Sequence, residues 1–417
     1  MLINYKIRAL IIFFFKMITP QLAAETTLEN TIDLTKYAAL YKEELLTNIL
    51  PFWMEHSKDT QNGGFFTCLN RDGSVYDTDK FMWLQGRQVW CFSYMYANVA
   101  PKQEWLNMAL HGAAFMEKYG RDKEGNWYFS LTADGKPLVQ PYNIFSDCFA
   151  AMGFAALNKI KPEERYRKIA VETFENILKR QHNWKGIYNK AYPGTRVLKN
   201  FSLPMILCNL SLELESILGA DRVNEFIPLV INEVMNVFYQ PQLGLILENV
   251  YEDGSFCDSF EGRLLNPGHG IEAMWFIMDL GKRLNDQVLI EKACAIMLDT
   301  LKAGWDNEYG GIFYFLDLKG APPQQLEWDQ KLWWVHVEAL VALAKGYALT
   351  GNDECRQWFE RVHNYTWKHF KDPKHKEWFG YLNRRGEVLL PLKGGKWKGC
   401  FHVPRALYQI SKTLETL

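Results

Sequence analysis

Two histidines sit in similar local sequences although they lie far apart in the chain. His269 occurs in GHGIEAMW and His402 in GCFHVPRA, and each stands between a glycine-containing turn and an apolar, helix-like run. An imidazole has an ordinary pKa of about 6.5, so at neutral pH one histidine can accept a proton while another donates one. Two such groups on opposite sides of a carbon acid could epimerise a carbon next to a carbonyl group.

Further polar residues stand at the starts of other apolar segments. In the strings LQGRQVW, IFSDCFA, FSLPMIL, GHGIEAM, WWVHVEA and CFHVPRA they are Gln85, Arg87, Asp147, His269, Glu272, His336, Glu338, His402 and Arg405. A buried polar group without a partner costs about 1–3 kcal/mol, so we expect these side chains to share one pocket. Arg87 would stabilise an enolate oxygen, and Glu272 and Glu338 would orient the histidines or hold hydroxyl groups.

His336 and Glu338 compete for one direction on the same predicted helix. Residues two apart diverge by about 200° around a helix, so only one of the two can face the pocket. We choose Glu338, which shares its face with Trp334.

Motifs of other chemistries do not appear in the sequence. GRDKEGNW lacks the Lys-Ser/Thr ending of a phosphate-binding loop, and PLKGGKWKG has the wrong spacing. HGIEA and HVEA are not the HExxH motif of zinc proteases, and no GxSxG nucleophile motif occurs. The eight cysteines are dispersed without a CxxC motif. We therefore expect acid–base chemistry without a metal or a consumed cofactor.

The composition limits the partners of the chain. A formal net charge of -1 and a pI of about 6.8 provide no field that would attract nucleic acid or an anionic membrane. Dispersed cysteines favour reduced thiols and hence the cytoplasm. The stretch MLINYKIRALIIFFFKMITPQLAAE nevertheless resembles a signal peptide, which leaves export as the alternative, and Met17 is a second candidate start.

A repeat organises the remaining sequence. A glycine followed by alternating apolar residues and a polar turn recurs at Gly64, Gly125, Gly186, Gly244, Gly310 and Gly380. This pattern predicts a β-hairpin or an extended loop at each marker, and two amphipathic helical stretches separate successive markers.

Six helical pairs joined in this way predict an all-α (α/α)6 barrel with short β-hairpins in the long loops on one rim. A linear solenoid is the competing architecture, but the first and last helical segments lack polar outer caps, which favours a closed ring. In the ring, the starts of all inner helices meet at one pocket. We expect an N-terminal extension at residues 1–32 and one domain at residues 33–417.

At these residues the sequence resembles a known family. The strings DTDKFMWLQGRQVW, SFEGRLLNPGHGIEAMWF, LEWDQKLWWVHVEALVALAKG and GEVLLPLKGGKWKGCFHVPRAL are similar to the N-acylglucosamine 2-epimerases, also described as renin-binding proteins, in their bacterial branch. The resemblance covers roughly residues 35–415. It implies an (α/α)6 barrel that interconverts N-acetylglucosamine and N-acetylmannosamine by ring opening, C2 deprotonation and reprotonation.

The resemblance also implies roles for single residues. His269 and His402 would be the acid–base pair, with Arg87 and Glu338 as essential partners. Substrate contacts would come from Glu272, in a shared His-x-x-Glu motif, and from Lys190, in the YNKAYPGT loop. The remaining candidates for substrate binding are Asp147, Trp334 and Arg405. Members of the family commonly form homodimers and are activated by ATP that they do not consume.

Several other functions remain open at this point. A cellobiose 2-epimerase or an aldose–ketose isomerase acting on mannose would share the barrel and the histidines. A glycosidase on the same barrel would need two carboxylates flanking a glycosidic bond, whereas the expected pair here is histidine. A non-catalytic binding protein would leave the polar residues of the pocket unexplained.

Overall fold

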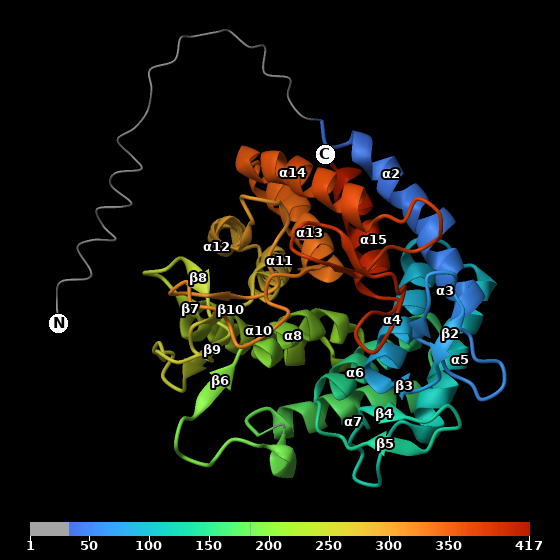
Figure 1. Cartoon of the computed structure of the whole chain (residues 1–417). Coiled ribbons are helices and arrows are strands. Elements are labelled where there is room, and N and C mark those ends of the chain that lie inside the picture. The colour runs from blue at the N-terminus through green and yellow to red at the C-terminus, as the bar shows by residue number, and fades with distance from the viewer. Residues whose placement is uncertain (1–32, 184) are drawn as a thin grey trace, which may run out of the picture. The chain divides into compact units, whose positions relative to one another are not determined.

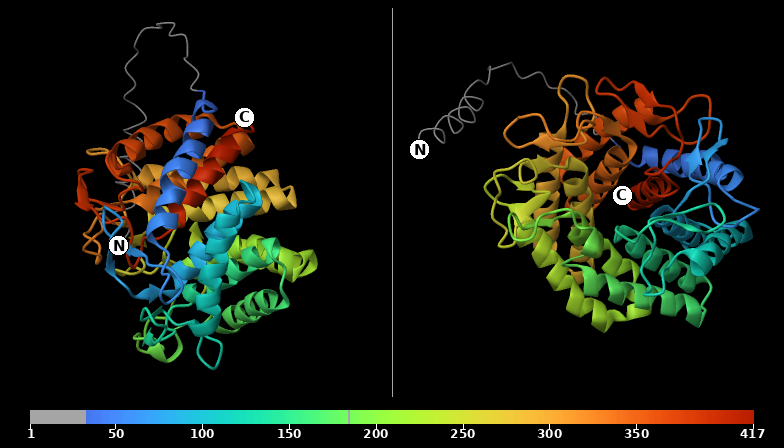
Figure 2. Two further views of the ribbon diagram at one scale, coloured as in Figure 1. Left: turned by 90° about the vertical axis from the view of Figure 1, so that its right-hand side faces the viewer. Right: turned by 60° about the horizontal axis from the view of Figure 1, so that its bottom comes forward.

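Helices in two concentric layers make up most of the computed structural model, which describes residues 33–183 and 185–417. Residues Leu34–Leu417 form one compact unit, and its helices follow one another around a ring (Figures 1 and 2). The predicted extension at residues 1–32 lies outside the described residues. The inner helices are α4 (Met82–Asn98), α6 (Phe145–Ile160), α8 (Ser202–Glu213), α11 (Pro267–Leu284), α13 (Trp333–Thr350) and α15 (His402–Leu414).

The outer layer pairs each inner helix with the outer helix that follows it, except that α15 pairs with α2 from the other end of the described chain. Its members are α2 (Lys36–Glu44), which continues through a π-helical turn (Leu45–Ile49) into α3 (Leu50–His56), α5 (Gln103–Tyr119), α7 (Glu164–Arg180), α10 (Ala220–Asn232), α12 (Gln287–Gly304) and α14 (Asp353–Phe370). The short helix α9 (Glu215–Leu218) and a second π-helical turn (Glu233–Phe238) flank α10.

Sequence pattern explains which helices lie inside. Every residue of α13 from Trp333 to Gly346 is buried, because this helix is apolar nearly all the way round and packs on both sides. Helix α14 instead buries one stripe that includes Cys355, Phe359, Val362 and Phe370, and it exposes the opposite face.

The ring closes between the two ends of the described chain. Helix α15 packs against α2, and the rings of Tyr94 on α4 and Tyr408 on α15 lie 5.3 Å apart. The (α/α)6 barrel is therefore confirmed over the linear solenoid. No helix among the described residues is long and apolar enough to span a bilayer.

Short antiparallel strands occupy the long loops. They are β1 (Cys68–Leu69), β2 (Val75–Asp77), β3 (Lys80–Phe81), β4 (Ser130–Leu131), β5 (Pro137–Val139), β6 (Leu198–Asn200), β7 (Tyr239–Gln240), β8 (Leu245–Ile246), β9 (Asn249–Tyr251), β10 (Leu264–Leu265), β11 (Leu316–Asp317), β12 (Lys331–Leu332), β13 (Tyr381–Leu382) and β14 (Val388–Leu390). The pairs β1–β2, β4–β5, β7–β8 and β13–β14 are local hairpins, as the repeat predicts.

Two markers differ from a local hairpin. The Gly186 marker begins a 3-10 turn (Gly186–Tyr188) in an exposed loop, where Ile187 is 90% exposed. After the Gly310 marker, β11 pairs with the distant strand β10. Strands β3 and β12 directly precede α4 and α13 and pair with β4 and β13 of the following loops, so the loops also brace the starts of inner helices.

Candidate active site

His269 is fixed in the first turn of α11. Pro267 opens this helix and the Asn266 side chain caps it by accepting a hydrogen bond from the His269 backbone N–H at 3.2 Å. The imidazole Nδ1 lies 3.0 Å from Glu248 Oε2, and a carboxylate can only accept, so Nδ1 donates. Burial disfavours the charged imidazole, but the charge of Glu248 and this hydrogen bond outweigh it and raise the pKa of His269.

His402 is the first residue of α15 and meets a different environment. Its Nδ1 lies 2.7 Å from Glu338 Oε1 and donates to it, which leaves Nε2 with a free lone pair. Burial and then the positive charge of Arg87 lower the pKa of His402 well below its usual value. His402 is therefore neutral at neutral pH and can act as a base.

Both imidazoles lie near one indole. The ring of Trp334 on α13 lies 5.4 Å from the ring of His269 and 5.8 Å from that of His402. Two titratable groups with opposite pKa shifts at one place are the arrangement expected of an acid and a base. Helices α11, α13 and α15 thus bring together two histidines from distant parts of the chain.

A buried ion network holds this arrangement. Arg405 donates through Nη2 to Glu272 and to Glu338, the latter at 2.8 Å. Glu338 also accepts from Trp275 Nε1 at 3.0 Å, so its carboxylate is held by three donors, including His402.

The same cluster has potential metal ligands. Single ligand atoms of Glu272, Glu338 and His402 all lie within 4.8 Å of one another. The guanidinium of Arg405 already donates to both carboxylates and supplies the positive charge that they require. Glu272 and Glu338 therefore fit an ion network that is centred on Arg405.

Arg87 projects from α4 into an aromatic cage. Its guanidinium carbon lies 4.4, 3.9 and 4.6 Å from the ring centroids of Trp83, Phe149 and Phe401, and its Nε has no hydrogen-bond partner within the described part of the chain. Burial lowers the pKa of Arg87 to about 9, so the group stays charged at neutral pH. A buried cation with a spare donor is suited to an oxyanion.

Other predicted residues have structural partners elsewhere. His336 points away from Glu338, because its Nδ1 donates to the Leu332 carbonyl and its Nε2 accepts from the Ile312 N–H. Gln85 similarly bonds both backbone groups of Phe65. These side chains fasten the long loops onto inner helices.

Asp147 and Lys190 are not brought to the histidines. Asp147 is fully buried and accepts from Arg180, the last residue of the outer helix α7, at 2.9 Å. Burial raises the pKa of Asp147 to about 7 even though Arg180 opposes the shift. Lys190 is exposed in the loop between α7 and β6.

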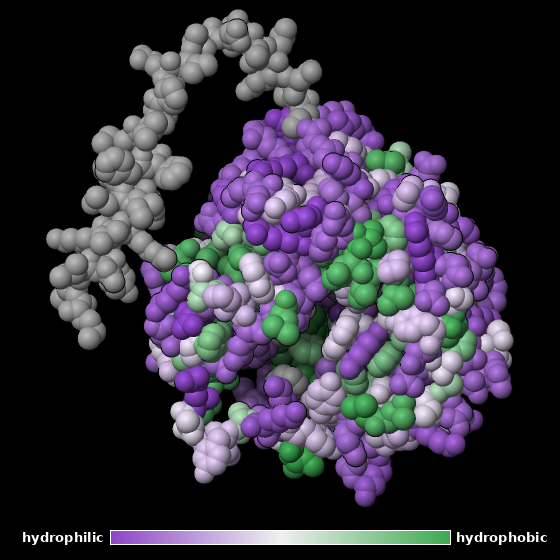
Figure 3. Space-filling model, in the orientation of Figure 1, coloured by the Kyte–Doolittle hydropathy of each residue, from purple (hydrophilic) through white to green (hydrophobic). Residues whose placement is uncertain are grey.

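Sequence reasoning missed Glu248, the partner of His269. It lies between β8 and β9 and is only 7% exposed. The sequence feature that indicates Glu248 is a single carboxylate within the otherwise apolar alternation GLILENV. Glu248 and His269 border a cavity of about 320 Å³, together with Asn200, Asn266 and Tyr314. The face shown in Figure 3 is hollowed near its centre.

The fold and the site together define a class of protein: an (α/α)6 barrel in which two buried histidines from distant parts of the chain lie near one tryptophan. The chain belongs to the N-acylglucosamine 2-epimerase (GlcNAc 2-epimerase) family, whose model matches residues 64–406, and it is an isomerase. It is 39% identical over 389 residues to an N-acylglucosamine 2-epimerase of Bos taurus, covering 89% of this chain and 90% of the relative.

More distant relatives act on another sugar. A cellobiose 2-epimerase of Bacteroides fragilis is 24% identical over 398 residues, covering 88% of this chain and 97% of the relative. A solved cellobiose 2-epimerase from Bacillus thermoamylovorans superposes with a TM-score of 0.78 at 20% identity, covering 90% of this chain and 99% of that one. This structural likeness confirms the barrel fold.

Proposed function

We propose that the protein interconverts N-acetyl-D-glucosamine and N-acetyl-D-mannosamine by epimerisation at C2. The observation that carries the proposal is the pair of imidazoles with opposite pKa shifts near Trp334. The 39% identity to the bovine N-acylglucosamine 2-epimerase supports the choice of an N-acylated sugar over cellobiose, whose 2-epimerase is 24% identical.

The reaction then follows from the protonation states. After ring opening exposes the C1 aldehyde, Nε2 of His402 takes the C2 proton, and the electron pair of the C–H bond moves toward the C1 oxygen. Arg87 stabilises the resulting enolate oxygen. Nε2–H of His269 returns a proton to the opposite face of C2, and the carbonyl re-forms. Glu338 and Glu248 hold the two rings by their Nδ1–H groups.

Substitution of either histidine tests this mechanism. We expect His402→Asn and His269→Asn each to lower kcat for N-acetylmannosamine by at least about 100-fold, because positioned acid–base groups contribute about 10²–10⁴-fold. His182→Asn, in an exposed turn after α7, is the control and should retain activity. In deuterated water the product should carry deuterium at C2. Near-parental activity of either variant, or product without label, would contradict the two-histidine mechanism.

A comparison of sugars tests the substrate. The same two imidazoles could epimerise cellobiose or isomerise mannose, so the purified protein should be offered N-acetylglucosamine, cellobiose and mannose in parallel. We expect the highest kcat/KM for the N-acylated sugar. A higher value for cellobiose or mannose would assign the protein to that substrate instead.

The family resemblance supports two further parts of the proposal, the homodimer and its activation by ATP, and the cysteines support a third, the cytoplasmic location. We propose a cytoplasmic homodimer that ATP activates without being consumed. All eight cysteines are buried free thiols, which fits a reducing compartment. Light scattering of the purified protein measures the dimer, and epimerase assays with ATP, combined with ADP detection, measure activation without hydrolysis.

A further inference from the structure

The indole of Trp275 contacts the carboxylate that holds His402. Trp275 lies on α11 and is only 1% exposed. Its Nε1 donates to Oε2 of Glu338 at 3.0 Å, whereas His402 and Arg405 both donate to the other oxygen, Oε1. Within residues 33–183 and 185–417, Trp275 is thus the one side chain that donates to Oε2.

This hydrogen bond limits the rotation of the Glu338 carboxylate. The terminal torsion of a glutamate side chain is broad, so the carboxylate turns easily about its last bond. Two donors to Oε1 do not prevent the turn, because both attach to one atom. A third donor at Oε2 prevents it, because a hydrogen bond prefers the plane of the acceptor group. Oε1 then meets the Nδ1–H of His402 from a fixed position, and the rigid ring gives Nε2 a fixed direction.

The indole is itself fixed by charged groups. The Nζ atom of Lys345 on α13 lies 4.6 Å from the ring centroid, and the guanidinium carbon of Arg405 lies 5.1 Å from it. Lys345 also donates to both oxygens of Asp279 at 2.7 Å, and Asp279 follows Trp275 by one turn of α11. Contacts from three helices therefore determine where the indole N–H points.

The glutamate that holds His269 is secured in a similar way. Oε2 of Glu248 accepts from the imidazole, and its other oxygen, Oε1, lies 3.1 Å from the Ser202 hydroxyl oxygen. A buried indole usually finds some acceptor for its N–H, so a hydrogen bond alone would indicate only packing. What distinguishes Trp275 is its acceptor, because Glu338 orients the histidine that takes the C2 proton.

We propose that Trp275 is a positioning residue for His402 in the epimerisation proposed above, on which this role rests. The indole N–H fixes the Glu338 carboxylate, and the carboxylate directs Nε2 of His402 toward C2 of the sugar. Trp275 acts through Glu338 and takes no part in the proton transfer itself.

Replacement of the N–H group alone tests this role. Incorporation of 3-benzothienylalanine at position 275 puts a sulfur atom in place of the indole N–H and keeps the shape of the side chain. Trp275→Phe removes the same donor together with part of the ring. Trp127 is the matched control for both changes: it is fully buried, donates to the Thr173 hydroxyl at 3.0 Å, and has the guanidinium carbon of Arg121 at 5.4 Å from its ring.

The kinetic effect should fall on kcat. We expect both changes at Trp275 to lower kcat for N-acetylmannosamine about tenfold and to leave KM within about twofold, because misplacing a reacting group by about 1 Å can cost about 100-fold in rate. The Tm of the benzothienylalanine variant should stay near that of the parent, so that a smaller folded fraction does not explain the loss. The same changes at Trp127 should retain kcat.

Proton NMR of the protein with isotope-labelled histidine reports the orientation of His402 without reference to epimerisation. A buried Nδ1–H that donates to a carboxylate gives its own downfield signal, and His402→Asn assigns the one from His402. We expect this signal to shift or broaden in both variants of Trp275, while the His269 signal stays in place. An unchanged His402 signal, or a kcat like that of the Trp127 controls, overturns the proposal. If the protein epimerises none of the sugars, the proposed function fails, and the two imidazole signals still decide whether Trp275 orients His402.

Discussion

At the scale of residues, the same kind of contact accompanies opposite pKa shifts in the two histidines. Each Nδ1–H donates to a glutamate, yet the pKa of His269 is raised and that of His402 is lowered. The difference lies in what surrounds each carboxylate. Apart from His269 itself, no cation among the described residues forms an ion pair with Glu248, whereas Glu338 shares its charge with Arg405, and Arg87 also acts on His402.

This asymmetry predicts the pH dependence of the reaction. The active form of the pair carries one proton, so kcat/KM should be bell-shaped. The alkaline limb should follow the raised pKa of His269, above about 6.5, and the acid limb the lowered pKa of His402, well below about 6.5. We expect the change Glu248→Gln to move the alkaline limb to lower pH, because the neutral amide no longer favours the imidazolium.

The matched control for this experiment is Glu252→Gln, which removes a carboxylate from an exposed position in the same loop. Its pH profile should follow that of the parent. An alkaline limb that stays in place in Glu248→Gln would mean that His269 is not the group that loses the proton.

The sequence predicted single residues where their helix determined their direction. His269 and His402 could be singled out because few histidines stand at helix starts, and Glu338 followed from the helical period. Asp147 was placed by the same reasoning, but its side chain turns to Arg180 on the outer helix α7. Glu248 was missed because its role depends on a loop folding back onto α11, which no local pattern encodes.

At the scale of elements, the helices were predictable and the strand pairs only partly so. Amphipathic periodicity is a local property of the sequence, and it predicts helical stretches between successive markers. A hairpin such as β13–β14 is local too, and its turn residues indicate it. The pairing of β10 with β11 joins two different loops, so it depends on how the barrel arranges them.

The contact between α4 and α6 gives a prediction at this scale. The two helices approach through glycines: a Cβ at Gly86 would lie 2.4 Å from the Phe149 carbonyl oxygen, and one at Gly153 would lie 2.7 Å from the Gly86 oxygen. Backbone atoms cannot move aside without separating the helices. We expect Gly86→Ala to lower the free energy of unfolding by about 1–3 kcal/mol, measured in urea, and to reduce kcat/KM by displacing Arg87.

Gly346 provides the comparison, because a Cβ there would meet side chains and not backbone. A Cβ at Gly346 on α13 would meet the sulfur atoms of Cys355 at 3.0 Å and Cys294 at 3.2 Å, and these side chains can shift. Gly346→Ala should therefore lose less stability and retain activity. Equal losses in the two variants would show that the α4–α6 contact is not the tighter one.

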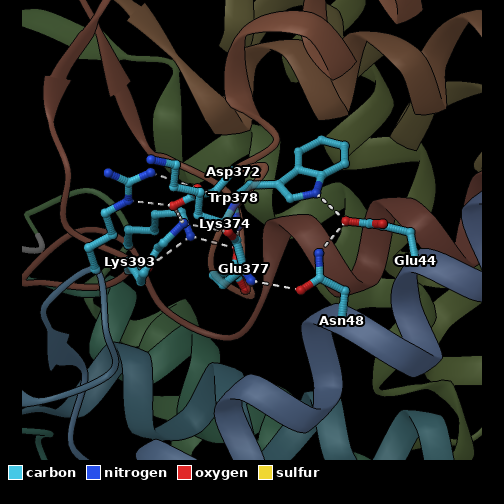
Figure 4. Close-up of polar contacts among 9 residues, drawn as sticks. Glu44, Asn48, Asp372, Lys374, Glu377, Trp378 and Lys393 are labelled. Atoms are coloured by element: carbon cyan, nitrogen blue, oxygen red, sulfur yellow. Dashed lines mark hydrogen bonds and ion pairs between the residues drawn. The ribbon is translucent and has the colours of Figure 1, made fainter.

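At the scale of the whole molecule, a buried polar network joins the first helices to the segment after α14 (Figure 4). Glu44 accepts from Trp378 Nε1 at 2.8 Å, and the side chain of Asn48 accepts from the Glu377 N–H at 3.0 Å. The Glu377 carboxylate accepts from Lys398 at 2.8 Å and from Trp53. These contacts lie at the seam where the ends of the described chain meet.

The seam distinguishes a closed ring from a solenoid. Glu377 has a left-handed backbone, with φ at 62°, and is fully buried, so its conformation depends on these partners. In a solenoid, a destabilising substitution near one end would unfold the repeats at that end alone. In a ring, opening the seam should destabilise every helix pair together.

The variant Glu377→Gln tests this coupling. An amide keeps one acceptor oxygen but presents its NH2 group to the donor of either Lys398 or Trp53, and it leaves a buried ammonium without a counter-charge. We therefore expect a loss of about 3–5 kcal/mol in the free energy of unfolding. Glu55→Gln breaks the exposed ion pair with Lys376 across the same seam and should cost about 0–1 kcal/mol. Hydrogen exchange should show protection falling in α8, on another side of the ring, as much as in α2 and α15. Full protection of α8 in Glu377→Gln would mean that the barrel unfolds from its ends and that the seam contributes no cooperativity.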